Sequence, residues 1–140
     1  MNRFIVDNCK NIYLAGYETT AVSAIWCLML LASNQEWQDR VREDVLQVCK
    51  GQSPDANMLR KMKSVCRLPH LYMPFGVGPR ACLGQNLAMV ELKILLALLL
   101  SNFSFSLSPK YRHSPALRLV IEPGNGVHLL VRKLSTSALP

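Results

Sequence analysis

The sequence predicts a single domain that is mainly helical, with a small β portion near its C-terminus. Hydrophobic residues make up 50% of the 140 positions, which is enough to build a buried core. The segment from Phe4 to Ser33 contains no proline and repeats apolar residues at helical spacing. Phe103, Phe105 and Leu107 alternate with serines, which is the two-residue period of a β-strand.

Residues 1–33 are predicted to form one long helix. Its helical spacing is carried by Ile12, Ala15, Thr19, Val22 and Trp26. A membrane span needs about 20 apolar residues, but the polar side chains of Glu18–Thr20 interrupt the apolar run at 12–32. We therefore expect a buried helix of a soluble core. Residues 1–11 mix both charges and do not form a signal peptide, so no targeting sequence is expected there.

Residues 34–65 are predicted to form two further helices. Asn34 is a suitable N-cap for the first, and Lys50–Gly51 ends it. Its expected buried stripe is Trp37, Val41, Val45 and Val48, and its expected solvent face is Arg40, Arg42, Glu43 and Asp44. Ser53–Asp55 opens the second helix. The expected buried side of that helix is Met58, Leu59 and Met62.

Residues 66–84 break the helical pattern with three prolines and three glycines set among aromatic residues, which predicts an ordered loop. The run Leu83–Ser101 is strongly apolar and predicts a helix, which we assign to the segment 85–102. Strands are expected within residues 103–134.

The later part of that β segment contains two strand-like runs, Leu117–Ile121 and Val127–Val131. The glycine-rich link Glu122–Gly126 joins them, and this arrangement predicts a β-hairpin between the two runs.

Cysteine usage and charge limit the function classes. The five cysteines are odd in number and contain no C-x-x-C pair, which disfavours a disulfide framework or a zinc site and implies reduced thiols. The net charge of +7 suits an acidic partner, an anionic membrane surface or nucleic acid. The basic residues are spread along the chain instead of clustering with stacking aromatic residues, so nucleic-acid binding is not expected.

The loop ending at Gly84 carries the clearest chemical signal. Gly76 and Gly78 permit a tight turn, and Cys82 lies at the start of the next helix, whose positive end favours a thiolate. Arg80 supplies a fixed cation beside it. A buried structural cysteine is the ordinary alternative for a lone thiol. That alternative applies to Cys9, Cys27, Cys49 and Cys66, which lack such surroundings.

The signature F-x-x-G-x-R-x-C-x-G is met at Phe75, Gly78, Arg80, Cys82 and Gly84, and the loop therefore resembles the haem-thiolate loop of the cytochrome P450 family. The resemblance implies haem b as cofactor, with Cys82 as its axial thiolate ligand and iron-binding residue. It implies that Phe75, Gly78 and Gly84 contact the cofactor and that Arg80 pairs with a propionate. The fold implied is a single partial P450 domain over residues 1–140.

A second motif lies inside the first helix, where Ala15–Thr20 resembles the family's A/G-G-x-D/E-T-T motif on the distal side of the haem. The resemblance implies that Ala15 and Gly16 lie against the cofactor and that Thr19 and Glu18 are catalytic residues that relay protons. The structural alternative is a core helix that kinks at its glycine, with Glu18 satisfied at one end.

The implied activity is an O2-dependent oxidation of a small apolar molecule by a haem monooxygenase. The implied partner is the flavoprotein NADPH-cytochrome P450 reductase, with Arg67 and Lys93 facing it or merely solvated. The family location is the cytosolic face of the endoplasmic reticulum, or the cytoplasm for a chain made in this form. The amino-acid sequence of the loop looks closest to that of plant members that oxidise isoprenoid hormones.

Two departures from the family pattern stand out. No E-x-x-R occurs, although that motif helps to lock the family's core around the haem loop. The chain passes directly from Val65 to Cys66 where the E-x-x-R helix is expected, and the family's N-terminal part with its membrane anchor has no counterpart. These departures predict an impaired, truncated enzyme. The alternatives are a non-catalytic helical remnant that only interacts, or the product of an error in gene prediction.

Overall fold

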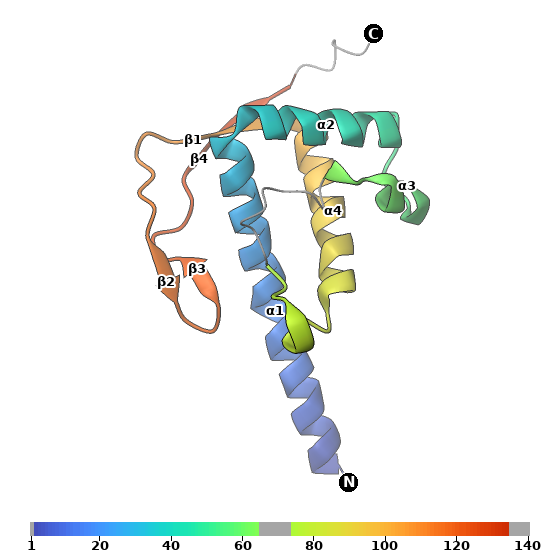
Figure 1. Cartoon of the computed structure of the whole chain (residues 1–140), viewed down its shortest axis with the longest axis vertical. Coiled ribbons are helices and arrows are strands. Elements are labelled where there is room, and N and C mark those ends of the chain that lie inside the picture. The colour runs from blue at the N-terminus through green and yellow to red at the C-terminus, as the bar shows by residue number, and fades with distance from the viewer. Residues whose placement is uncertain (1, 65–73, 135–140) are drawn as a thin grey trace.

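A computed structural model describes residues 2–64 and 74–134 of the chain (Figure 1). The α-helices are α1 (Asn2–Ser33), α2 (Gln35–Cys49), α3 (Ala56–Lys61) and α4 (Gln85–Asn102), and the 3-10 turn η2 covers Gly78–Arg80. The strands are β1 (Phe103–Leu107), β2 (Pro115–Leu117), β3 (Ile121–Pro123) and β4 (Leu129–Lys133). The predicted mainly helical fold with a small β portion is confirmed.

The core lies where α2 crosses the ends of α1 and α4, with β1 packed beside it (Figure 1). Its largest fully buried apolar side chains are Leu31, Met62, Leu96, Leu100, Val41 and Val45. These residues come from four segments that are far apart in the sequence, so burying them together fixes the relative positions of the three longest helices.

Local signals set the helix ends as predicted. The Asn34 side chain accepts a hydrogen bond of 3.1 Å from the Trp37 amide and caps α2. Lys50 ends the helix in the left-handed conformation with φ 48°, followed by Gly51 with φ 77°. Asp55 caps α3 by accepting from two backbone amides at 2.8 Å.

The polar residue Gln38 of α2 is completely buried. Its Nε2 donates to the carbonyls of Leu31 (3.0 Å) and Phe105 (2.9 Å), and its Oε1 accepts from the Phe105 amide (2.9 Å). Arg42 donates to that same Oε1 at 2.8 Å and to the carbonyls of Leu100 and Phe103, at 3.1 and 3.3 Å. The assignment of Arg42 to the solvent face was therefore wrong, since the end of α4 supplies acceptors that sequence spacing does not reveal.

The predicted hairpin between Leu117–Ile121 and Val127–Val131 is also wrong. β2 pairs with β3 across the turn at 118–120, and β4 pairs with β1 in an antiparallel register that sets Phe105 opposite Val131. Gly124 sits against Ser114, whose carbonyl accepts from its amide at 2.7 Å, so the glycine-rich link closes the β2–β3 unit. The chain then leaves that unit, and β4 pairs beside β1, which Phe105 anchors in the core.

The N-terminal part of α1 extends beyond the rest of the molecule (Figure 1). Its buried residues, Ala24, Cys27, Leu31 and Ala32, all lie near its C-terminal end, so the expectation of a buried helix is confirmed there and is wrong for residues 2–18, which are exposed. By length and composition α1 and α4 are each apolar enough to cross a membrane, a test that core helices of soluble proteins also pass. Exposed apolar side chains on the N-terminal part of α1 include Phe4, Ile12, Tyr13 and Tyr17.

Replacing Gln38 by leucine should destabilise the fold by about 2–4 kcal/mol, because backbone groups of Phe105 and Leu31 would lose their buried partners. Urea unfolding followed by far-UV circular dichroism measures this loss. Gln47→Leu is the matched control, since Gln47 is exposed on the same helix and should change stability by less than about 0.5 kcal/mol. Equal effects from the two variants would contradict the role assigned to Gln38.

Stability should also fall at alkaline pH through Cys49. Burial raises the pKa of the Cys49 thiol, and the Asp55 carboxylate raises it further. The unfolded chain releases the Cys49 proton at a lower pH than the folded chain. The contribution of the protonated thiol to the free energy of unfolding is therefore fully present below the ordinary pKa of 9.0, and it is lost as pH rises through the pKa of Cys49 in the folded chain.

Urea unfolding at about pH 7.5 and about pH 10 tests this linkage. The free energy of unfolding of Cys49→Ala should fall less between the two pH values than that of the unaltered chain. Cys9→Ala, which removes an exposed thiol, should keep the original pH dependence. If Cys49→Ala also keeps it, the raised pKa of Cys49 does not contribute to stability.

Candidate functional site

The loop before α4 is closed by one backbone hydrogen bond, in which the Cys82 amide donates to the Phe75 carbonyl at 2.9 Å. Within the loop, the Ala81 amide donates to the Gly78 carbonyl at 3.1 Å and forms η2. The Cys82 carbonyl in turn accepts from the Gln85 amide at 3.4 Å, at the start of α4. The cysteine is therefore held between a closed loop and a helix N-terminus.

Two glycines give this loop its shape. Gly76 has φ 66° and Gly78 has φ 82°, and both values lie in the left-handed region that side chains with a Cβ rarely adopt. Gly84 has an ordinary φ of −87°, and its importance is spatial: a Cβ built there would lie 3.9 Å from Cys82 Sγ. The missing Cβ leaves free space beside the sulfur.

The side chains of the loop are accessible to a ligand. Cys82 and Arg80 are exposed, and Phe75 is half-buried. Within residues 2–64 and 74–134, Arg80 makes no ion pair, so its guanidinium is available to an anionic group. The apolar side chains of Val77, Leu83 and Leu87 are also exposed in and just after the loop.

The side chains around Cys82 fit haem. One thiolate suffices as protein ligand, because the porphyrin itself supplies the other in-plane donors to iron. The accessible sulfur with open space beside Gly84, the available Arg80 cation and the exposed apolar side chains match a flat apolar cofactor that carries carboxylates. No group of three or more His, Cys, Asp or Glu in the described segments could hold a bare metal ion. The donor set therefore fits haem.

The second motif lies on an exposed part of α1. Ala15, Gly16 and Glu18 are exposed, and Thr19 is half-buried. Thr19 Oγ1 donates to the Ala15 carbonyl at 2.6 Å, the i−4 bond that threonine often makes within helices. No atom lies within 4 Å of a Cβ built on Gly16, so the space beside this glycine is open.

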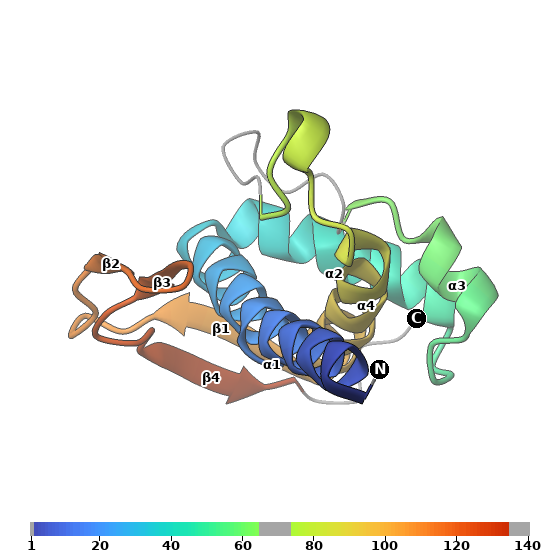
Figure 2. The same ribbon diagram turned by 90° about the horizontal axis from the view of Figure 1, so that it is seen from below.

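The structure does not bring the two motifs into contact. The loop projects over the middle of α1 in Figure 1, whereas the view in Figure 2, turned by 90°, shows the two segments standing apart. The sequence-predicted residues thus lie on two separate surfaces, each accessible on its own.

Of the two basic residues that we considered for contact with a reductase, the structure describes only Lys93. Lys93 is half-buried, and its Nζ donates to the Leu59 carbonyl at 2.7 Å, which ties α4 to α3. Lys93 is therefore not a fully solvated surface residue, and its contact with a reductase stays a prediction. Arg67, Cys66 and the Val65–Cys66 junction lie outside the described residues.

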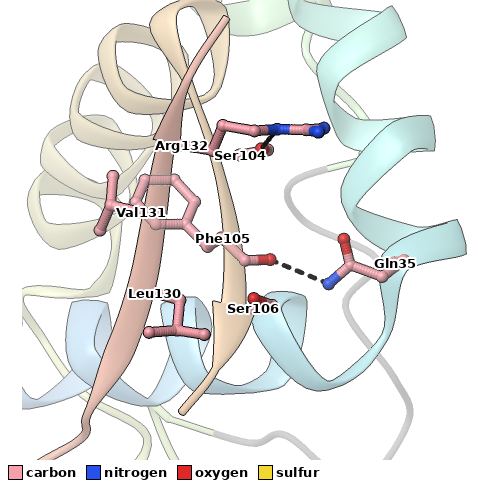
Figure 3. A pocket seen from close by; sticks show the side chains of 7 residues that line it. All are labelled: Gln35, Ser104, Phe105, Ser106, Leu130, Val131 and Arg132. Carbon is pink, nitrogen blue, oxygen red and sulfur yellow. Dashed lines mark hydrogen bonds between the residues drawn. The ribbon is translucent and has the colours of Figure 1, made fainter.

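A surface pocket of about 270 Å³ lies on the β1–β4 sheet, between Gln35 and the facing strands (Figure 3). It is lined by Gln35, Ser104, Phe105, Ser106, Leu130, Val131 and Arg132. Figure 2 shows this sheet and η2 on opposite sides of the helices, so the pocket does not belong to the cysteine loop.

Comparison with known proteins gives consistent matches. The Cytochrome P450 family profile matches residues 2–67 and 63–130. Cytochrome P450 714C2 of Oryza sativa subsp. japonica is 42% identical over 202 residues, covering 94% of this chain and 39% of its own length. Cytochrome P450 714B3 of Zea mays is 38% identical, with coverages of 95% and 38%. For Cytochrome P450 714A2 of Arabidopsis thaliana the identity is 34%, with coverages of 92% and 38%.

The chain spans about two fifths of the length of these relatives. The alignments are also longer than the chain: 94% of 140 residues is about 132, whereas the alignment with the first rice protein has 202 positions. That relative therefore has about 70 aligned positions opposite which this chain has no residue. The two family matches meet at residues 63–67, next to the abrupt step from helix to loop noted in the sequence.

The left-handed glycine at position 78 should control the closure of the cysteine loop. Gly78→Ala places a Cβ at φ 82°, at a cost of about 1–2 kcal/mol, and should speed hydrogen exchange of the Cys82 amide about tenfold. NMR or mass spectrometry measures the exchange. Gly84→Ala is the control, because its φ is ordinary and its Cβ would make only van der Waals contact with the sulfur. Unchanged exchange in Gly78→Ala would contradict this account of the loop.

Proposed function

The chain belongs to the cytochrome P450 family, and from this premise we propose that it is part of a haem-thiolate monooxygenase in which Cys82 is the iron ligand. The observation that carries the proposal is the geometry around Cys82. Its thiol is exposed, it lies three residues before α4 begins at Gln85, and the glycine at position 84 leaves space at the sulfur. Haem, when bound, supplies the redox chemistry and the activation of dioxygen.

The residues of the loop hold and orient such a cofactor. The closing bond from the Cys82 amide to the Phe75 carbonyl fixes the sulfur relative to the loop. Arg80 binds a propionate, and the side chain of Phe75 excludes water from one side of the sulfur. The N-terminus of α4 begins three residues after Cys82, and helix N-termini favour negative charge.

On α1, we assign the distal side of the cofactor to the surface around Gly16, where the absent Cβ leaves room for a bound group. The proton of Thr19 Oγ1 is engaged with the Ala15 carbonyl, so its oxygen can accept a hydrogen bond from a neighbouring donor. Neighbouring residues on a helix point about 100° apart, so Glu18 and Thr19 exchange a proton only through water. Glu18 is exposed and can take that proton from solvent.

We propose that the monooxygenase is impaired in this chain because an internal segment is missing. The longer alignments and the two family matches that meet at residues 63–67 support this proposal. So does the absence of any E-x-x-R in the sequence. The exposed apolar residues of α1 and α4 have the same origin, since a segment that would cover them is not supplied by the described residues.

For the intact activity, we propose a small apolar substrate of the plant isoprenoid-hormone class, electrons from NADPH-cytochrome P450 reductase, and a location at the cytosolic face of the endoplasmic reticulum. The plant relatives support the family part of this proposal. The net charge of +7 suits both an acidic reductase surface and an anionic membrane.

The ligand assignment is tested by absorbance of the purified chain, titrated with ferrous haem in the presence of carbon monoxide. The unaltered chain should develop a thiolate-type Soret band at excess haem and lose it on dilution, because the haem edges are poorly covered. Cys82→Ser should lack the band at every haem concentration.

Cys9→Ser is the matched control, because Cys9 is also exposed but lies on α1 without a loop around it. It should give the same band as the unaltered chain. A thiolate band that persists in Cys82→Ser, or one that never forms in the unaltered chain, would overturn the assignment of Cys82.

A further inference from the structure

Trp26 joins α1 to the β2–β3 unit (residues 114–124), which lies far from it in the sequence. The indole Nε1 of Trp26 donates a hydrogen bond of 2.9 Å to the carbonyl of Ile121, 95 residues later in the chain. The Trp26 ring also meets the His113 ring edge to face, with the ring centroids 5.7 Å apart and the planes at 62°. One side chain of α1 therefore contacts both β3 and the residue just before the β2–β3 unit.

His113 is itself held in place from the other side. The Tyr111 hydroxyl and His113 Nδ1 are hydrogen-bonded at 2.9 Å, and their rings lie edge to face at 6.2 Å. The Tyr111 amide donates to the Ser108 carbonyl at 2.9 Å, directly after β1. The contact between Trp26 and His113 is thereby connected to the end of β1.

The β2–β3 unit is closed by bonds of its own. The Gly124 amide donates to the Ser114 carbonyl at 2.7 Å, and the Arg118 amide donates to the Val120 carbonyl at 3.1 Å. Arg118 also forms an ion pair of 3.0 Å with Glu122. A two-stranded hairpin is nevertheless only marginally stable in water, so the unit needs support from a neighbouring element. β3 packs against α1, and both views show the unit beside that helix (Figures 1 and 2).

Trp26 lies on the same face of α1 as part of the distal motif. Seven residues separate it from Thr19, and seven residues are almost two turns of an α-helix, or about 10 Å along its axis. Gly16 lies three residues before Thr19 and belongs to the same face. We call this surface, made by Gly16, Thr19 and Trp26, the Thr19 face.

We propose that Trp26 is a positioning residue that holds the β2–β3 unit beside the Thr19 face of α1. A unit held there limits the access of water and of small solutes to the surface around Thr19. The importance of that surface rests on the proposed function, whereas the contacts of Trp26 exist without a cofactor. Trp26 thus acts through the unit that it holds and not through contact with the reacting atoms.

Hydrogen exchange of the full chain without haem, followed by mass spectrometry, tests the support that Trp26 gives. Trp26→Phe keeps an aromatic ring but removes the donor to Ile121, and should speed the exchange of amides within residues 114–124 about tenfold. His113→Gln removes the ring on the other side of the contact and should act in the same direction. Trp37→Phe is the matched control, because Trp37 is half-buried on α2 and stacks with Arg40. It should leave exchange in 114–124 unchanged.

A second measurement separates positioning from mere stabilisation. Thr19→Cys introduces a thiol on the Thr19 face, and its alkylation by N-ethylmaleimide is followed by mass spectrometry. Adding Trp26→Phe should speed this alkylation about threefold, because the β2–β3 unit no longer limits access. Cys9 is exposed on the same helix and is the internal control, since its alkylation rate should not change.

The proposal is overturned if Trp26→Phe leaves exchange in residues 114–124 unchanged. It is also overturned if exchange rises while alkylation at position 19 stays the same, because Trp26 would then stabilise the unit without positioning it at the Thr19 face. Neither measurement uses haem, so both outcomes are independent of the haem titration that tests Cys82.

Discussion

Gln38 joins three elements that the chain must hold together before any surface can function. Its amide bonds the end of α1 through Leu31 and both backbone groups of Phe105, while its oxygen also orients Arg42 toward the end of α4. Because these groups are buried, losing a partner costs far more than an exposed hydrogen bond contributes. The apolar core provides the driving force for collapse, but this amide determines which edge of β1 faces α2.

The same network leaves the two chemically important segments at a distance from the region that it stabilises. It contacts the C-terminal ends of α1 and α4, whereas the Ala15–Thr20 motif lies in the exposed part of α1 and Cys82 precedes the start of α4. The cysteine loop depends on its own closing bond and on its glycines. A cofactor between the loop and α1 would therefore gain little rigidity from the core, which agrees with the weak cofactor binding that we propose.

Features decided by neighbouring residues could be predicted from the sequence, and features decided by distant partners could not. Asn34 caps its own helix, and the loop signature fixes the spacing of Cys82 within ten residues, so both are readable locally. Gln38 and Arg42 take their roles from carbonyls about 60 to 70 residues away. The pairing of β4 with β1 was missed for the same reason, since a glycine-rich link next to two apolar runs is the stronger local signal for a hairpin.

The contrast between the two edges of the sheet follows from the position of α2. Since α2 is fixed against β1 by Gln38, Gln35 and Arg42, it can cover that edge alone, and the opposite edge is left to β4. β4 carries the basic residues Arg132 and Lys133 beside its apolar side chains, and charged residues on an edge strand disfavour pairing with a further strand. The asymmetry that Gln38 imposes on β1 thus determines which edge of the sheet lies against α2.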